Sequence, residues 1–131
     1  MECGADLTAG LRLIGRAFGV DRAAICLAMV GAPDDPGMGM FTASSDALES
    51  VCMTCTKANF AQIYLMATDP DRQRRGAGWA VMARAMETAM RDIATDFCMM
   101  ASGAGERLYH AFRYETHELV EYWMVNPTTG A

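Results

Sequence analysis

An apolar stripe with helical spacing opens the chain. Its members recur at intervals of three and four residues: Leu7, Leu11, Ile14 and Phe18. This spacing predicts a helix with one buried face, capped by Asp6 or Thr8 and ended by Gly19. The apolar run that follows, Arg22 to Val30, fits a helix or a buried strand, and its alanines and the capping Asp21 favour a helix.

Three short segments then alternate between apolar and polar positions, and residues typical of turns separate them. They run from Met38 to Ala43, from Leu48 to Thr56 and from Phe60 to Ala67. In the middle segment the alternation predicts one face formed by Val51, Met53 and Cys55 and another formed by Ser50, Cys52 and Thr54. Sequential strands with tight turns predict an antiparallel meander.

The second half of the chain is predicted to continue as helix, strand, helix and strand. A long helix is expected from Gly78 to about Asp92. Its apolar face would consist of Trp79, Met82, Ala83, Met86 and Met90. Asp96 to Ala101 is almost wholly apolar, which predicts a central strand buried on both faces. A short helix from Glu106 to Phe112 and a last strand from about His117 to Val125 follow, and the tail 127–131 is expected to be loose.

Length and composition indicate a single globular domain that spans residues 1–131. Apolar residues make up 52% of the chain and charged residues 21%, which is a globular rather than a disordered balance. No apolar run approaches the roughly 20 residues that a membrane-spanning helix needs. The N-terminus also lacks the basic segment of a signal peptide. We therefore expect a cytoplasmic protein that does not interact with a membrane.

The five cysteines are expected to be free thiols, since no export signal is apparent. Cys52 and Cys55 have the spacing of half a zinc or redox site. Three residues apart along a strand, however, their sulfur atoms would point to opposite faces of the sheet. The only histidines are His110 and His117, so the sequence predicts no metal site.

A net charge of −5 disfavours nucleic acid as a partner, because its phosphates require a basic surface. The same acidity favours a cationic amine as substrate through long-range steering. Arg72, Arg74 and Arg75 form a local basic cluster, beside glycines that open the long helix. The first N–H groups of such a helix are unpaired and its dipole is positive there, so the loop suits a diphosphate. Glycine lets a phosphate reach the main chain without meeting a Cβ.

This loop resembles the phosphate loop of a known superfamily. Its residues Gln73, Arg74, Arg75, Gly76, Ala77 and Gly78 match the Gln/Arg-x-x-Gly-x-Gly/Ala signature of the GNAT N-acetyltransferases. A second stretch, Ala101-Ser102 followed by Leu108-Tyr109, resembles the segment after the corresponding buried strand in that superfamily. The two motifs lie on the expected elements and in the expected order.

The resemblance implies an α+β fold with a GNAT-like mixed, mainly antiparallel sheet of about five strands flanked by about four helices. The sheet would be splayed between the strands 60–67 and 96–101, which correspond to the fourth and fifth strands of the superfamily, and acetyl-CoA would lie in the gap. Its pantetheine would pair with the main chain of the first strand, and its diphosphate would rest on the loop. The implied cofactor-binding residues are Leu65, Met66, Ala67, Gln73, Arg74, Arg75, Gly76, Ala77, Gly78, Trp79, Ser102 and Tyr109.

The implied chemistry is the attack of an amine on the thioester of acetyl-CoA. It requires a neutral amine, a donor to the developing oxyanion and an acid for the leaving thiolate. We expect the Met66 N–H to be the donor and the Tyr109 phenol, with an unperturbed pKa of about 10, to be the acid. The histone-acetylating branch has a glutamate base where this chain has Gln62, which cannot accept a proton. The other candidates for a base are Glu49, His117 and Glu118.

The sequence thus predicts an acetyl-CoA-dependent N-acetyltransferase that acts on a primary amine of a small molecule. A protein N-acetyltransferase is a variant of this interpretation. The alternative is an acyl-CoA-binding module without turnover, acting as a sensor or as a subunit of a complex. Three departures from the superfamily pattern leave it open: Gln62, the replacement of Gly-Phe by Arg113-Tyr114, and the lack of a clear strand before the first helix. Homodimerisation would cover the sheet edges of such a short version.

Overall fold

The computed structural model describes residues 5–19, 37–99, 101–119 and 121. In this part of the chain three α-helices and four strands follow one another, and a single 3₁₀ turn precedes the longest helix. The elements are α1 (Ala5–Phe18), β1 (Met38–Ser44), β2 (Leu48–Lys57), β3 (Phe60–Thr68), η2 (Pro70–Arg72), α3 (Ala77–Asp92), β4 (Asp96–Met99) and α4 (Glu106–Ala111).

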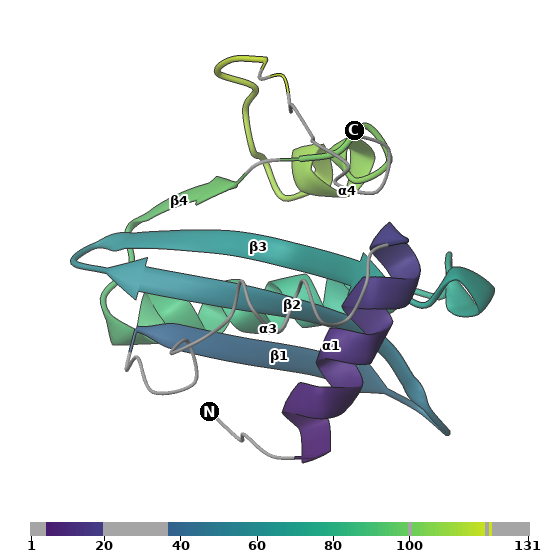
Figure 1. The fold of residues 1–131 in the computed structure, drawn as a ribbon. Helices are drawn as coiled ribbons and strands as arrows, with labels where there is room; N and C mark the ends of the chain where they lie inside the picture. The colour runs from purple at the N-terminus through teal and green to yellow at the C-terminus, as the bar shows by residue number, and fades with distance from the viewer. Residues whose placement is uncertain (1–4, 20–36, 100, 120, 122–131) are drawn as a thin grey trace, which may run out of the picture.

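The four strands form one sheet in the order β1-β2-β3-β4 (Figure 1). The first three strands are antiparallel neighbours, which confirms the predicted meander, and β4 is parallel to β3. The ladder between β3 and β4 is short, because its last pair is Ile63 with Met99. From Tyr64 to Thr68, β3 continues without β4 beside it. The mixed sheet is therefore splayed between these two strands, as the sequence predicted.

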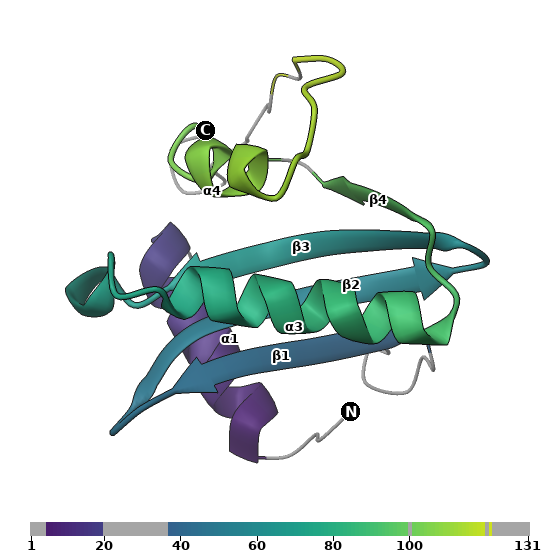
Figure 2. The ribbon, with the colours of Figure 1, turned by 180° about the vertical axis from the view of Figure 1, so that it is seen from behind.

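Helices cover both faces of this sheet. α1 lies across one face, and α3 runs along the other, over β1 and β2 (Figure 2). The alternation along β2 decides which side chain meets which helix. Val51 and Met53 pack with Ile14 of α1, whereas Cys52 packs with Met82 of α3. The two predicted faces of β2 are thereby confirmed.

The start of α1 differs from the prediction. The helix begins at Ala5, so neither Asp6 nor Thr8 lies outside it as a cap. Its end agrees with the prediction, because Gly19 follows the last helical residue with a left-handed φ of 65°.

The buried face of α3 also differs. Trp79 and Met90 were predicted to be buried, yet they are 49% and 55% exposed. The buried residues are Ala77, Val81, Met82, Ala85 and Ala89. Alanine lets a helix backbone approach a sheet closely, so side-chain size rather than hydrophobicity alone orients this helix. Glu87 and Arg91, one turn apart along the helix, form an ion pair at 2.6 Å.

The strand β4 is not buried on both faces. Asp96 and Cys98 are exposed, whereas Phe97 and Met99 are partly buried. Within the described residues β4 pairs only with β3, so it does not occupy the central position that its apolar sequence suggested.

Some predicted elements lie outside the described residues. These are the helix at 22–30, the tail 127–131 and most of the strand at 117–125, whose described residues 117–119 and 121 are not in a strand. No helix in the described ranges is long and apolar enough to cross a membrane.

The packing of α1 on the sheet yields a stability prediction. Ile14 is fully buried, so Ile14→Ala removes apolar contacts and leaves a cavity. We expect the free energy of unfolding, measured by urea denaturation, to fall by about 2–5 kcal/mol. Ile93→Ala is the matched control, since Ile93 is 60% exposed, and it should change stability by no more than about 0.5 kcal/mol. Equal losses for the two variants would contradict the described core.

Candidate active site

Charged side chains tether the loop between β3 and α3 to α1. Asp69, the residue after β3, is buried and accepts a hydrogen bond from the Asp71 N–H at 3.0 Å. The Arg16 guanidinium of α1 pairs with the Asp69 carboxylate at 3.3 Å and with the Asp71 carboxylate at 3.4 Å. The Asp69 N–H donates to the Glu49 carbonyl at 2.7 Å, which joins the loop to β2 as well.

Arg72 belongs to this tether and not to a ligand-facing cluster. Its guanidinium lies 2.6 Å from Asp46 and 3.6 Å from Glu49, and its hydrogen bond to Asp46 holds the pKa of that carboxyl below its usual range. The sequence prediction that Arg72 would face a diphosphate is therefore wrong. Arg74 and Arg75, by contrast, are exposed beside the start of α3.

The loop backbone has an unusual conformation between η2 and α3. Arg74 has φ 66° and Gly76 has φ 85°, so two residues in three are left-handed. A left-handed residue other than glycine costs about 1–3 kcal/mol and persists only where the surroundings enforce it. Such alternating conformations turn successive N–H groups toward one side and create a concave anion site. A Cβ added at Gly76 would meet no atom within 4 Å, so the space beside this glycine is open.

Within the described residues, the first amides of α3 have no side-chain cap, and the first turn of the helix contains no acidic residue. The Ala80 N–H makes the first bond back into the helix, to the Gly76 carbonyl at 3.0 Å. The N–H groups of Ala77, Gly78 and Trp79 therefore precede the intrahelical ladder. Together with the positive end of the helix dipole they give this end of α3 a geometry that suits an anion.

A bulge marks the part of β3 that extends past β4. Between residues 64 and 67, β3 has one residue more than the facing stretch 51–53 of β2. Leu65 has a left-handed φ of 50°, and it precedes Met66 in this bulge. A bulge leaves one residue unpaired and redirects its neighbours, and bulges are frequent next to active sites.

Beside this bulge lies a small cavity of about 60 Å³. It is lined by Phe18, Ile63, Tyr64, Leu65, Met66, Met99, Ser102 and Tyr109. Four residues predicted for the site thus come together from separate segments: Leu65, Met66, Ser102 and Tyr109. Phe18, at the end of α1, was not predicted, and its periodicity indicated only a core position.

The anion site and the cavity adjoin each other. A Cβ added at Gly78 would lie 3.3 Å from the Met66 side chain and 3.5 Å from Leu108, so this glycine allows α3 to pack against β3 and α4. The Trp79 ring stacks on Phe112, with 4.1 Å between ring centroids. The start of α3 is therefore held against both sides of the splayed gap.

Comparisons with known proteins find this architecture among solved structures. An aminoglycoside 6'-N-acetyltransferase from Acinetobacter haemolyticus superposes with a TM-score of 0.76 at 15% identity, over 95% of each chain. A Trypanosoma brucei acetyltransferase matches with a TM-score of 0.72 at 14% identity, over 92% of this chain and 94% of the other. AAC(6')-Iy, solved with a CoA bisubstrate analogue, matches with a TM-score of 0.73 at 13% identity, over 92% and 91% of the two chains.

The chain has the GNAT acetyltransferase fold. No protein-family model matches the sequence, and no curated protein sequence matches it. At these identities the likeness establishes the fold, and the chemistry has to be argued from the residues.

Tyr109 of α4 lines the small cavity as a buried phenol. Its side chain is among the core residues, and the ring folds over Gly105 so closely that an added Cβ there would lie 2.7 Å from a ring carbon. The Tyr114 ring packs edge-on against it at 6.4 Å. Burial raises the pKa of the Tyr109 phenol above its usual value, so the hydroxyl is protonated at neutral pH and able to donate a proton.

None of the predicted bases reaches this cavity. Gln62 is exposed on β3. Glu49 is buried, but it accepts a hydrogen bond from Ser45 and lies next to Arg72, so it serves the loop tether. His117 and Glu118 are exposed after α4, and the described residues that line the cavity include neither a carboxylate nor an imidazole.

Cys52 and Cys55 of β2 are free thiols. Cys52 is buried and Cys55 is partly exposed, and the described ranges contain no group of residues that could hold a metal ion. Burial raises the pKa of the Cys52 thiol to about 12. At neutral pH it is therefore a protonated core side chain and not a nucleophile.

This environment predicts which thiols react. At pH 8, iodoacetamide should modify the exposed Cys98 quickly and leave Cys52 unmodified on the same timescale, because only a thiolate reacts and Cys52 titrates near pH 12. Peptide mass spectrometry of quenched samples measures both rates. After denaturation in urea the two rates should become similar, which is the control. Equal rates in the native protein would contradict the buried position of Cys52.

Proposed function

We propose that this chain binds acetyl-CoA and transfers the acetyl group to a primary amine of a small molecule. One observation carries the proposal: among the described residues, the stretch of β3 beyond its last pair with β4 and the uncapped start of α3 meet beside a cavity lined by the protonated phenol of Tyr109. Acyl transfer from an extended carrier that bears a diphosphate requires three features. These are an anion site for the diphosphate, a strand edge for the extended chain and a proton donor for the leaving thiolate.

Each part of acetyl-CoA has a counterpart in this arrangement. The diphosphate would accept hydrogen bonds from the amides between Gly76 and Trp79, with Arg74 and Arg75 neutralising its charge. The amides of pantetheine would pair with the main chain of β3 from Leu65 to Ala67, as an added strand does. The thioester would then lie toward the small cavity, which has room for a group of only a few atoms.

The reaction needs three changes of bonding. The amine nitrogen attacks the thioester carbon, which forms a C–N bond and places negative charge on the carbonyl oxygen. The Met66 N–H, in the bulge, would donate to that oxyanion. When the C–S bond breaks, the Tyr109 phenol would protonate the thiolate, and the proton of the amine would leave to water, since no described residue of the cavity lining is a base. The products are an amide and free CoA.

The choice of acceptor rests on charge and on similar proteins. The net charge of −5 attracts a cationic amine. One of the similar structures is an aminoglycoside 6'-N-acetyltransferase, and another was solved with a bisubstrate analogue that joins CoA to acetylneamine. We would therefore test polycationic amines first in a substrate screen.

A binding module without turnover is the second candidate, and one observation favours it. Within the described residues, Glu49 is engaged in the loop tether and no carboxylate or imidazole lines the cavity. A protein that only senses acyl-CoA needs the anion site and the strand edge but no base. Binding of acetyl-CoA without acetylation of any amine in a broad panel would support this candidate.

The anion site is tested by replacing Gly76 with valine. The side chain would fill the open space beside the amides, so we expect the Kd of acetyl-CoA, measured by calorimetry, to rise at least about tenfold through the loss of charge-assisted hydrogen bonds. Gly19→Val is the matched control, because Gly19 has a similar φ of 65° and equally open surroundings at the end of α1. Gly19→Val should be destabilised by the same backbone strain, but its affinity for acetyl-CoA should not change. Unchanged affinity of Gly76→Val would remove the loop from the site.

The role of Tyr109 is tested by Tyr109→Phe. We expect turnover of an accepted amine to fall about 100-fold, while the Kd of acetyl-CoA changes little, because the phenol acts on the leaving thiolate. Tyr114→Phe removes the same group from the neighbouring ring, and the Tyr114 hydroxyl has no hydrogen-bond partner in the described part of the chain. That control should leave turnover unchanged. Full activity of Tyr109→Phe would exclude the phenol as the acid.

A further inference from the structure

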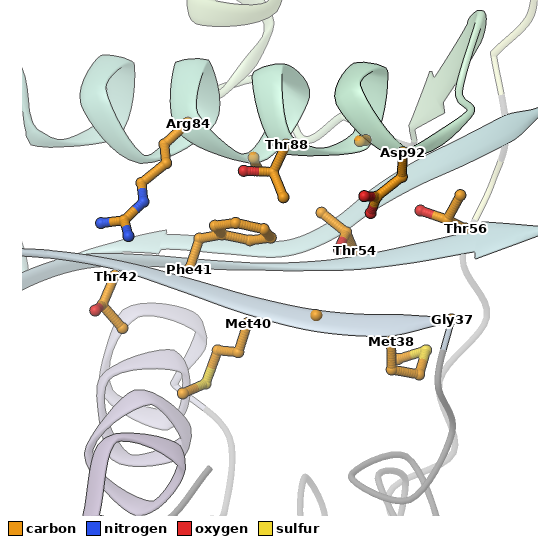
Figure 3. A pocket seen from close by; sticks show the side chains of 13 residues that line it. Gly37, Met38, Met40, Phe41, Thr42, Thr54, Thr56, Arg84, Thr88 and Asp92 are labelled. Carbon is orange, nitrogen blue, oxygen red and sulfur yellow. The ribbon is translucent and has the colours of Figure 1, made fainter. Parts of the chain in front are cut away.

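A second hollow, of about 450 Å³, lies between α3 and β1 and has no lining residue in common with the cavity at Tyr109 (Figure 3). Small residues create it. Gly39 faces it from β1, Ala85 and Ala89 face it from α3, and the helix approaches the sheet closely there. Thr54 of β2 contributes to its floor. The hollow therefore belongs to the outer edge of the sheet, at the opposite end of the strand order from β4.

The edge formed by β1 is open to another strand. In the described part of the chain β1 pairs only with β2. The Gly37 carbonyl accepts a hydrogen bond from the Thr56 N–H at 2.7 Å. Because inward and outward main-chain groups alternate along an antiparallel pair, those of Met38, Met40 and Thr42 point away from β2.

This edge also lacks the features that usually prevent strand addition. The sequence of β1, Met-Gly-Met-Phe-Thr-Ala-Ser, contains no charged residue and no proline, and its only irregularity is at the last pair. Exposed edge strands commonly carry lysine, proline or a bulge that blocks pairing with another chain. Most of β1 has no lysine, no proline and no bulge. This indicates that another segment or another copy of the chain covers its edge in solution.

The helix above the hollow carries a self-complementary pattern. Arg84, Thr88 and Asp92 recur every four residues, so they form one stripe along α3 over the hollow. In Figure 3 Arg84 extends toward the Thr42 end of β1 and Asp92 toward the other end, with Thr88 between them. No other described residue forms an ion pair with either charge of this stripe. A two-fold axis near Thr88 would place Arg84 of each copy opposite Asp92 of the other.

We propose that two copies of this chain associate through β1 about such an axis, which joins their sheets into one. The dimensions agree. Neighbouring strands lie about 4.8 Å apart, and α3 lies over β1 and β2, about one strand spacing from the axis. The two copies of α3 would then run antiparallel at a separation of about 10 Å, a normal packing distance for helices. Each hollow would be closed by the other copy, and the splayed gap at β3 and β4 would stay open.

Charge reversal on α3 tests this surface. We expect sedimentation velocity at micromolar concentration to show a dimer. Arg84→Glu and Asp92→Arg would each place like charges opposite one another twice, so each should raise the dimer dissociation constant at least about tenfold. The double variant exchanges the two charges and should restore the dimer. Arg12→Glu, an equal charge change on the exposed side of α1, is the control and should leave the dimer intact.

A second variant covers the strand itself. Met40→Pro removes an outward N–H at the centre of β1 while the pairs with β2 remain, so it should also produce monomers. Circular dichroism checks that each variant is folded. A wild-type monomer at 100 µM, or a dimer that neither single reversal weakens, would overturn the proposal. So would a monomer whose outward β1 amides resist hydrogen exchange, since another segment of its own chain would then cover the edge.

Discussion

The site of this protein depends on the early end of the ladder between β3 and β4. Within the described residues, these two parallel strands pair only as far as Ile63 and Met99, and β3 continues past β4 to Thr68. Unpaired main-chain groups of a buried strand need partners, and an extended ligand with amide groups can supply them. Everything else in the site, from the loop to the phenol of α4, is arranged around this interruption.

The loop illustrates how distant residues hold a strained backbone. Arg74 and Gly76 have left-handed conformations, which direct amides outward. Nearby, Arg16 of α1 pairs with the Asp69 carboxylate and Arg72 pairs with the Asp46 carboxylate. Two of the cations in this region thus support the loop and two are left at its surface. The sequence around the glycines does not show which arginines are paired. Asp46 is distant in sequence from Arg72, and Asp69 pairs with an arginine of α1.

The small residues of α3 have two structural consequences, one at each end of the helix. Its small residues let it lie close to β1 and β2, which brings its first turn beside Met66 and Leu108. The same small residues leave a hollow under its other end, where the stripe of Arg84, Thr88 and Asp92 lies above an uncharged edge strand. Close approach at the start of the helix would serve the ligand that we propose, and the hollow along the rest would take the proposed second copy.

The sequence by itself determined the elements whose signal is local. Alternation in β2 and the Gly-rich start of α3 predicted the strand faces and the helix start, because these follow from neighbouring residues. The resemblance carried by the two motifs implied the splayed α+β fold. Tertiary structure decided what depends on contacts between distant segments. The pairing of Arg72, the exposure of Trp79 and the edge position of β4 could not be predicted, since each depends on a partner or a competing side chain far along the chain.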